Sequence, residues 1–410
     1  MSLIELIGTI LVFASTGLIG LVIVKRLAIP YSLLLVLLGF AISWGIAPFG
    51  WDTGVRASNF QDLMLFVLLP VLIFESALSL DSKLLFKFMP NIVTLATLGM
   101  VLSTLIFAVL LFYGIGDPGF PFIAALLTGA VISATDPVAV ISQLRLLNAP
   151  KDLHILIEGE SLFNDATAIV LFTILLGLSL GTDDIEVLDS LVKFVVVFVG
   201  GAMVGAILGV CAGYFLKVIE PCVQHIVLTT LVLAYGSFYL AEHTLHVSGI
   251  VAVLFAALAF KKCAATTLKQ RESELHHIWQ SLGFIANVFV FVLLGLVVSI
   301  EMFTDMWLAI LIAIVAAFIA RTAAVYISIW VNKVTLGEPT PTNFPPIMIW
   351  GGIRGAITIA LVLSLPTTLP YWSTIQSIGF GVVLFSLIVQ ATTNPLLIKI
   401  LILKQEKIHV

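Results

Sequence analysis

The chain has 410 residues, of which 60% are hydrophobic and 10% are charged, and its formal net charge is −4. Because a soluble domain carries about a quarter charged residues, this composition excludes an ordinary soluble protein and favours one embedded in a membrane. The mild charge and the lack of a basic run give no support for nucleic-acid binding. Three cysteines without paired spacing predict neither a disulfide framework nor a zinc site.

Hydrophobic runs separated by charged or Gly- and Pro-rich breaks predict about thirteen helices, most of them long enough to cross about 30 Å of hydrocarbon. The first contains Glu5 in place of a basic leader region and has no evident cleavage site, so we expect a retained helix. The fold class is therefore an all-α polytopic membrane protein. The expected ranges are 3–24, 29–47, 61–80, 91–114, 120–144, 155–178, 190–217, 224–243, 246–261, 278–300, 307–331, 345–365 and 373–403.

The charges of alternate loops indicate the direction of the helices. The loops after odd-numbered helices, with the C-terminal end, hold 15 of the 19 basic residues: Lys25, Arg26, Lys83, Lys87, Arg145, Lys151, Lys217, Lys261, Lys262, Lys269, Arg271, Lys333, Lys399, Lys404 and Lys407. The opposite side holds Arg56 and Lys193, together with Asp183, Asp184, Glu186 and Asp189. Because cytoplasmic loops are enriched in Lys and Arg, we expect a cell-membrane protein with its N-terminus outside and its C-terminus in the cytoplasm.

Two of the predicted helices carry helix-breaking residues near their centres. One break is the run from Ser133 to Pro137, and the other runs from Gly351 to Gly355. The two helices stand seven apart, as expected of inverted six-helix repeats at about 1–180 and 224–403 with a linker helix at about 190–217. Discontinuous helices at matching positions in two halves point to the binding site of a transporter, although Pro and Gly in membrane helices also serve close packing.

Asp165 lies about eleven residues into its helix, which places this carboxylate near the bilayer centre. A charged carboxylate there costs several kcal/mol unless it is paired, solvated or neutralised. Helical spacing puts Ser161 beside Asp165, and Glu160 beside Asn164, on adjacent stripes. Polar groups of this helix are therefore candidates for a buried binding site.

Thr135 and Asp136 reach a similar depth from the first helix break. With Asp165 and Ser161 they supply oxygen ligands, which suit small hard cations such as sodium. Burial also favours the protonated form of a carboxylate. A site neutralised by either a sodium ion or a proton, never by both, predicts an exchanger.

Arg321 and Arg354 are the two basic residues left over, and both fall in the middle of a predicted span, which makes them candidates for a functional role. We expect Arg354 to pair with Glu160, and Arg321 to lie at the helix break, where it offsets exposed carbonyl groups. One of the three deep acids then remains for transport. The alternative is a fixed ion-pair network that never titrates.

Three segments together resemble the monovalent cation/proton antiporter family, in its sodium/proton exchanger branch of NhaP-type proteins: Ala134–Val140, Glu158–Asp165 and Gly351–Ala356. The resemblance covers nearly the whole chain. It implies thirteen helices, with a dimerisation domain and a core domain whose broken helices cross near the ion. It also implies an ion site of Asp165, Ser161, Thr135 and Asp136, with Asn164 stabilising the core, Glu160 paired with Arg354, and Arg321 as the family's arginine of helix eleven.

The same resemblance implies that the protein is not an enzyme, needs no cofactor, and exchanges Na⁺ (and Li⁺) for H⁺ as a homodimer in the lipid bilayer. The branch that carries an Asn-Asp pair, here Asn164 and Asp165, is similar to electroneutral one-for-one exchangers. Because the chain ends at Val410 shortly after the last span, we expect no soluble C-terminal regulatory domain. The roles of Glu75 and Glu158 stay open.

Other functions fit some of the same residues. A potassium/proton antiporter differs only in ion size, which oxygen ligands alone do not fix. A sodium-coupled organic-anion symporter shares the broken-helix architecture, but it needs a free arginine for the substrate carboxylate. An intramembrane aspartyl protease would use Asp136 and Asp165 as its pair of acids, yet it has no need of inverted repeats.

Overall fold

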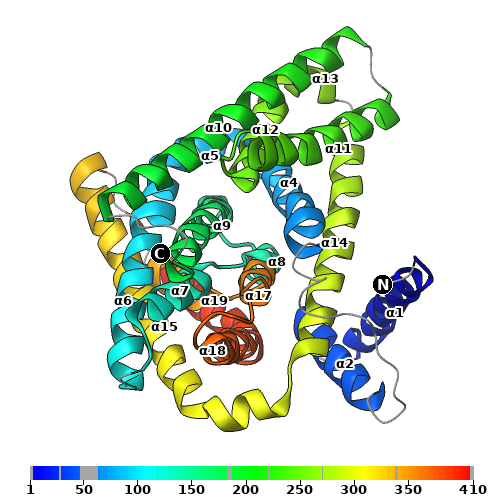
Figure 1. The fold of residues 1–410 in the computed structure, drawn as a ribbon. Coiled ribbons are helices and arrows are strands. Elements are labelled where there is room, and N and C mark those ends of the chain that lie inside the picture. Colours follow the sequence, from blue (N-terminus) through cyan, green and yellow to red (C-terminus); the bar gives the residue numbers. More distant parts are fainter. Residues whose placement is uncertain are drawn as a thin grey trace. The chain divides into compact units, whose positions relative to one another are not determined.

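The computed structural model describes residues 3–26, 29–46, 63–117, 119–181, 187–219, 222–269, 271–337 and 340–406. All regular secondary structure within these ranges is helical (Figure 1), which confirms the all-α class. Several residues that set the predicted orientation lie outside the described ranges: Arg56, Asp183, Asp184, Glu186 and Lys407.

Within the described residues, nine helices are long and apolar enough to cross a membrane. Shorter helices occupy the remaining predicted spans, so the exact count of thirteen crossings stays a prediction. The α-helices are α1 (Leu3–Val24), α2 (Tyr31–Ile46), α4 (Leu69–Ser79), α5 (Ser82–Thr94), α6 (Met100–Ile115), α7 (Phe122–Ser133), α8 (Val138–Leu146), α9 (Lys151–Ser179), α10 (Val187–Val218), α11 (Val223–Tyr239), α12 (Gly249–Cys263), α13 (Ala265–Leu268), α14 (Glu272–Val297), α15 (Ile300–Leu336), α16 (Phe344–Trp350), α17 (Ala356–Leu363), α18 (Trp372–Phe385) and α19 (Ala391–Glu406). Single π-helical turns are η2 (Leu63–Leu68), η3 (Leu95–Gly99), η4 (Leu240–Thr244) and η5 (Ser386–Gln390).

The fourth predicted span differs most from the structure. Its helix begins at Ser82 rather than at residue 91, because α5 runs through η3 into α6 without a gap. The charged residues Lys83 and Lys87 thus belong to a helical turn and not to a loop. A second departure is a kink in α15 at Met306, where φ is −117° and ψ is 21°.

Both predicted helix breaks are present. The first separates α7 from α8, and Ala134 is extended there with ψ of 139°. Pro137 explains the break, since it lacks an N–H donor and disfavours helix at Asp136. The second separates α16 from α17. A Cβ atom at Gly355 would overlap the side chain of Asp136, so glycine there lets the two breaks approach each other.

The chain divides into two compact units, and both broken helices belong to the first, which comprises Met1–Gln61, Met89–Asp165 and Asn287–Val410. In this unit α6 packs lengthwise against α15 and α7, and α18 packs against α15 and α17 (Figure 1). α9 contributes its residues up to Asp165. The functional candidates are therefore held by long helices on several sides.

The second unit comprises Asp62–Phe88 and Ala166–Ala286, and its main contact joins α10 to α12 (Figure 1). Gly201, Gly205 and Gly209 recur every four residues on α10 and face the backbone of α12. A Cβ at Gly205 would overlap the carbonyl oxygen of Ala252. Small residues at such spacing let membrane helices pack at close range.

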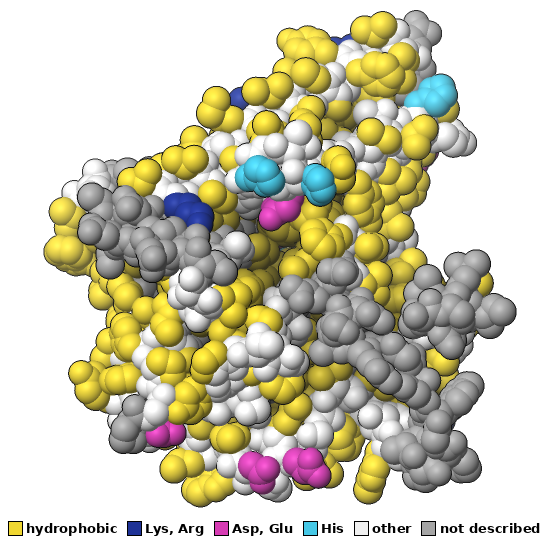
Figure 2. Space-filling view, in the orientation of Figure 1, with side chains coloured by type: hydrophobic (Ala, Val, Ile, Leu, Met, Phe, Trp, Pro, Cys, Tyr) yellow, Lys and Arg dark blue, Asp and Glu magenta, His cyan; other side chains and the backbone are white. Residues whose placement is uncertain are grey.

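The outer surface is suited to lipid. Figure 2 shows a face on which hydrophobic side chains predominate and charged ones are few. Along α10, large side chains such as Val196, Met203 and Ile207 are 58%, 60% and 59% exposed. Such exposure is costly in water but not in hydrocarbon, so the helices that carry it face a bilayer.

The close contact of α10 with α12 can be tested by adding one methyl group. We expect Gly205→Ala to lower the melting temperature in detergent, because overpacking costs about 1–3 kcal/mol and the methyl group meets a backbone oxygen. Gly236→Ala on α11 is the matched control, since nothing lies within 4 Å of a Cβ there. Equal melting temperatures for the two variants would contradict this packing.

Candidate functional site

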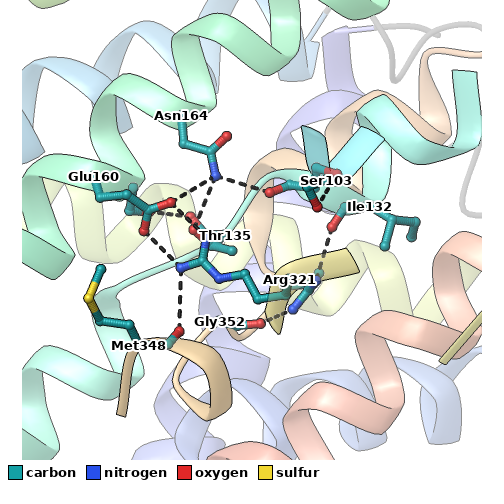
Figure 3. A network of polar contacts seen from close by, with 11 residues as sticks. Ser103, Ile132, Thr135, Glu160, Asn164, Arg321, Met348 and Gly352 are labelled. Carbon is teal, nitrogen blue, oxygen red and sulfur yellow. Dashed lines mark hydrogen bonds and ion pairs between the residues drawn. The ribbon is translucent and has the colours of Figure 1, made fainter. Parts of the chain in front are cut away.

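A buried ion pair joins α9 to α15. Arg321 donates from Nη1 to Oε1 of Glu160 at 2.8 Å and from Nη2 to Oε2 at 2.9 Å (Figure 3). The two residues are only 7% and 1% exposed. Two parallel bonds of this kind fix the relative orientation of both side chains. The expected pairing of Glu160 with Arg354 is therefore wrong, and Arg321 holds that place.

Arg354 instead donates hydrogen bonds to carbonyl groups that the helix breaks leave without helical partners. Its Nε donates to the carbonyl oxygen of Ile132 near the end of α7 at 3.0 Å, and its Nη1 donates to the carbonyl oxygen of Gly352. Arg321 also donates to a carbonyl group beside the second break: its Nη2 lies 3.4 Å from the carbonyl oxygen of Met348 in α16 (Figure 3). The sequence predicts a mid-span depth for both arginines, but depth does not say which way a side chain points.

Asp136 lies where the two breaks meet. Its backbone N–H donates to the carbonyl oxygen of Ile353 at 2.7 Å. Its Oδ1 accepts from the N–H of Val138 at 2.9 Å, and its Oδ2 accepts from the N–H of Ala356 at 3.3 Å. These N–H groups open α8 and α17, where helix dipoles place partial positive charge. The carboxylate thus compensates the N-terminal ends of both half-helices.

Side chains of α9 hold the extended segment of the first break. Asn164 donates from Nδ2 to the carbonyl oxygen of Ser133 at 3.0 Å, to Oγ1 of Thr135 at 3.5 Å and to Oε1 of Glu160 at 3.3 Å (Figure 3). The hydroxyl of Ser161 donates to the carbonyl oxygen of Thr135. The structure therefore brings together four predicted site residues: Thr135, Glu160, Ser161 and Asn164.

Asp165 differs from its neighbours in how its carboxylate is satisfied. It lies one turn beyond Ser161 on α9 and is 8% exposed. Its Oδ1 is buried and accepts no hydrogen bond from any residue that the structure describes. An ionised carboxylate in such a place pays a large desolvation cost without compensation. Binding a cation or a proton would remove that cost.

The sequence also left open the roles of two further acids, Glu75 and Glu158. Glu75 belongs to the second unit, and its Oε1 accepts from the hydroxyl of Ser79 at 3.1 Å. Glu158 is half-buried on α9. Within the described ranges, no three His, Cys, Asp or Glu side chains gather closely enough to hold a metal ion.

The sequence reasoning missed polar groups on the last predicted helix. Ser386 in η5 accepts a hydrogen bond from the N–H of Arg354 at 3.1 Å. Gln390 donates from Nε2 to the carbonyl oxygen of Trp350 at 3.0 Å. Ser386, Gln390 and Asn394 recur every four residues in an apolar span. That spacing marks a helix face turned towards protein rather than lipid, and it was a usable signal.

Comparison with known proteins gives consistent matches. The sequence model of the family described as "Sodium/hydrogen exchanger, transmembrane" matches residues 11–399. The Na⁺/H⁺ antiporter ApNhaP of Aphanothece halophytica is 34% identical over 377 residues, which are 90% of this chain and 69% of that protein. The Na⁺/H⁺ antiporter NhaH of Halobacillus aidingensis is 32% identical over 401 residues, with 95% and 96% covered.

Among solved structures, the sodium proton antiporter MjNhaP1 of Methanocaldococcus jannaschii at pH 8 superposes with a TM-score of 0.79. The match covers 96% of this chain and 99% of that one, at 22% sequence identity. The two chains therefore share a fold.

The ion pair of Glu160 and Arg321 can be tested by a double-mutant cycle. We expect Glu160→Gln and Arg321→Gln each to destabilise the protein by about 3–5 kcal/mol, because each leaves one buried charge unpaired. The double variant should lose far less than the sum of the two. The measurement is thermal unfolding in detergent. Additive losses would show that the two groups do not depend on each other.

Proposed function

Because the chain belongs to the sodium/hydrogen exchanger family, we propose that it is a secondary antiporter that exchanges Na⁺, and Li⁺, for H⁺ across a membrane. The observation that carries the proposal is the buried carboxylate of Asp165, whose Oδ1 lacks a hydrogen-bond partner among the described residues. The relatives named Na⁺/H⁺ antiporters support the same assignment.

Competition for Asp165 is the mechanism we assign. A charged, empty site is expensive to carry through a low-dielectric barrier, whereas a site neutralised by a cation or a proton can move. Alternating access then exposes the neutral site to either side in turn. Because sodium and proton never bind together, movement of one drives movement of the other.

Oxygens close to the first break are the proposed partners of Asp165 for the cation. The hydroxyl of Ser161 donates its proton to the carbonyl oxygen of Thr135, so its lone pairs remain able to accept a cation. Oγ1 of Thr135 receives a long bond from Asn164, at 3.5 Å. Neutral oxygens beside one carboxylate form the kind of ligand set that suits a monovalent hard cation.

The residues around these ligands are proposed to give the site its charge and shape. Asp136 accepts from the N–H groups of Val138 and Ala356, and these bonds stabilise its charged form. Glu160 forms an ion pair with Arg321. Asn164 carries an amide, which does not titrate. One carboxylate is then left to exchange one cation for one proton, so the exchange is electroneutral.

The same groups argue against an organic-anion substrate but do not choose between sodium and potassium. An organic-anion symporter needs a cationic side chain for its substrate, but Arg321 and Arg354 both donate to protein oxygens. Potassium remains the second candidate ion, because the proposed ligands do not by themselves fix ion size. Flux measured with sodium, lithium and potassium in turn separates these choices.

The proposal includes placement in the cell membrane with the N-terminus outside, the C-terminus in the cytoplasm, and two copies per assembly. The bias of basic residues towards alternate loops supports the orientation. Lys25, Arg26, Lys217, Lys261 and Lys262 lie at helix ends on the side assigned to the cytoplasm. The homodimer rests on the family resemblance.

Removing the titratable group of Asp165 tests the function directly. We expect Asp165→Asn to abolish sodium-driven proton flux in proteoliposomes, because an amide cannot exchange a proton for a cation. The melting temperature should be retained, since no charge is left unpaired. Asp152→Asn, in the first turn of the same helix, is the matched control and should exchange normally. Substantial flux through the Asp165 variant would rule out the proposal.

Competition also fixes the direction of the pH dependence. At pH values where Asp165 is largely protonated, each unit of acidification should raise the apparent KM for sodium by up to about tenfold, because one proton must leave for each cation bound. The maximal rate at saturating sodium should change much less. The measurement is initial sodium flux at several pH values. A KM that stays flat from acid to alkaline pH would mean separate sites for the two ions.

A further inference from the structure

A row of polar side chains runs along one face of η5 and α19, and we call it the polar stripe: Ser386, Gln390, Thr393 and Asn394. Ser386, Gln390 and Asn394 are almost fully buried, at 0%, 3% and 0% exposure. None of the four was assigned to the ion site. Burying amides and hydroxyls in a membrane is costly unless each has a partner, so their contacts indicate what the stripe is for.

One end of the stripe holds the second helix break. Gln390 donates to the carbonyl oxygen of Trp350, the last residue of α16, at 3.0 Å. The indole Nε1 of Trp350 in turn donates to Oγ1 of Thr393 at 2.9 Å. Ser386 accepts from the N–H of Arg354, inside the break and two residues before α17, at 3.1 Å. The stripe thus holds the end of α16 and the broken segment that follows it.

The other end holds the half-helix that follows the first break. Asn394 donates from Nδ2 to Oε1 of Gln143 on α8 at 2.7 Å. Gln143 donates from Nε2 back to the carbonyl oxygen of Ala391 at 2.8 Å. This reciprocal pair of bonds leaves little freedom for α8 to slide or turn against α19.

α8 transmits this restraint to the ion site. It is a short helix of nine residues, and its first N–H, at Val138, is bonded to the carboxylate of Asp136. Thr135 precedes Asp136 directly in the chain. A shift of Gln143 therefore moves the oxygens of Thr135 and Asp136 as well. Binding sites work only when such groups are held within about 0.5 Å of their places.

We infer that the polar stripe, with Gln143, is a positioning element that sets the cation affinity of the exchanger without touching the cation. The inference rests on the proposed exchange at Asp165 and extends it to residues on a different helix. Its effect is on binding, because displaced oxygens weaken the bound cation, while the protonated site needs no such geometry. Loss of the stripe therefore raises the KM for sodium more than it lowers the maximal rate.

The test uses Asn394→Leu, Gln143→Leu and the double variant in proteoliposomes, with sodium flux measured over a range of concentrations. Each single change should raise the KM for sodium by about tenfold or more, as is usual when a supporting partner of a cation site is lost. The double variant should be no worse than Gln143→Leu alone, because that change already removes both bonds between α8 and α19. Thr392→Val is the control, since Thr392 is exposed and its hydroxyl donates to the carbonyl oxygens of Ile388 and Val389 in the preceding turn.

A rescue variant separates positioning from simple stability. Exchanging the two amides, as Gln143→Asn with Asn394→Gln, keeps one donor and one acceptor across the gap and should bring the KM back towards that of the wild type. Unchanged KM in the Leu variants, additive effects in the double variant, or a lowered melting temperature with normal KM would each overturn the inference. If the wild-type protein exchanges sodium for protons and the Leu variants have the same KM for sodium, the inference is wrong but the proposed function stands. If the wild-type protein shows no cation-proton exchange, both the proposed function and this inference are wrong.

Discussion

A helix that is broken inside a membrane exposes backbone N–H and C=O groups, and each costs several kcal/mol if hydrocarbon surrounds it without a partner. This chain has two such breaks in contact with each other, at Asp136 and Ile353. The N–H groups that open α8 and α17 bond to the carboxylate of Asp136. The carbonyl groups of Ile132 and Gly352 bond to the guanidinium of Arg354. Most of the buried polar chemistry follows from the need to satisfy these groups.

The same requirement determines which buried acid is available to bind a transported ion. The carboxylate of Asp136 accepts hydrogen bonds from the N-terminal ends of two half-helices, and Glu160 forms an ion pair with Arg321. The Oδ1 of Asp165 accepts no hydrogen bond from the described residues. A buried carboxylate that the fold does not neutralise must take its neutralising partner from outside. In the proposed exchanger that partner is alternately a sodium ion and a proton.

Much of this arrangement could be predicted from sequence because its causes are local. Pro137 and the glycines from Gly351 to Gly355 break helices by backbone chemistry alone, and the depth of Asp165 follows from counting along an apolar span. The partner of Glu160 could not be predicted in the same way. Arg321 and Arg354 share a similar depth, and only the packing of α15 against its neighbours turns Arg321 towards Glu160.

The polar stripe was missed for a related reason. Gln390 and Asn394 lie in a span apolar enough to be taken for a lipid-facing helix, and isolated polar residues in such spans are often tolerated. Their partners, Trp350 and Gln143, are 40 and 251 residues away in sequence. The start of α5 at Ser82 is likewise not predicted, because the charges of Lys83 and Lys87 favour a loop there, whereas the structure has a helix.

The central claim is that one carboxylate exchanges one cation for one proton while Asp136 keeps its charge. The most direct test is to measure sodium-driven proton flux in proteoliposomes with and without an imposed membrane potential. Electroneutral exchange moves no net charge, so the account predicts the same flux and the same equilibrium sodium gradient at every potential. Flux that rises with one sign of the potential and falls with the other would show that a second charge moves, and would contradict the account.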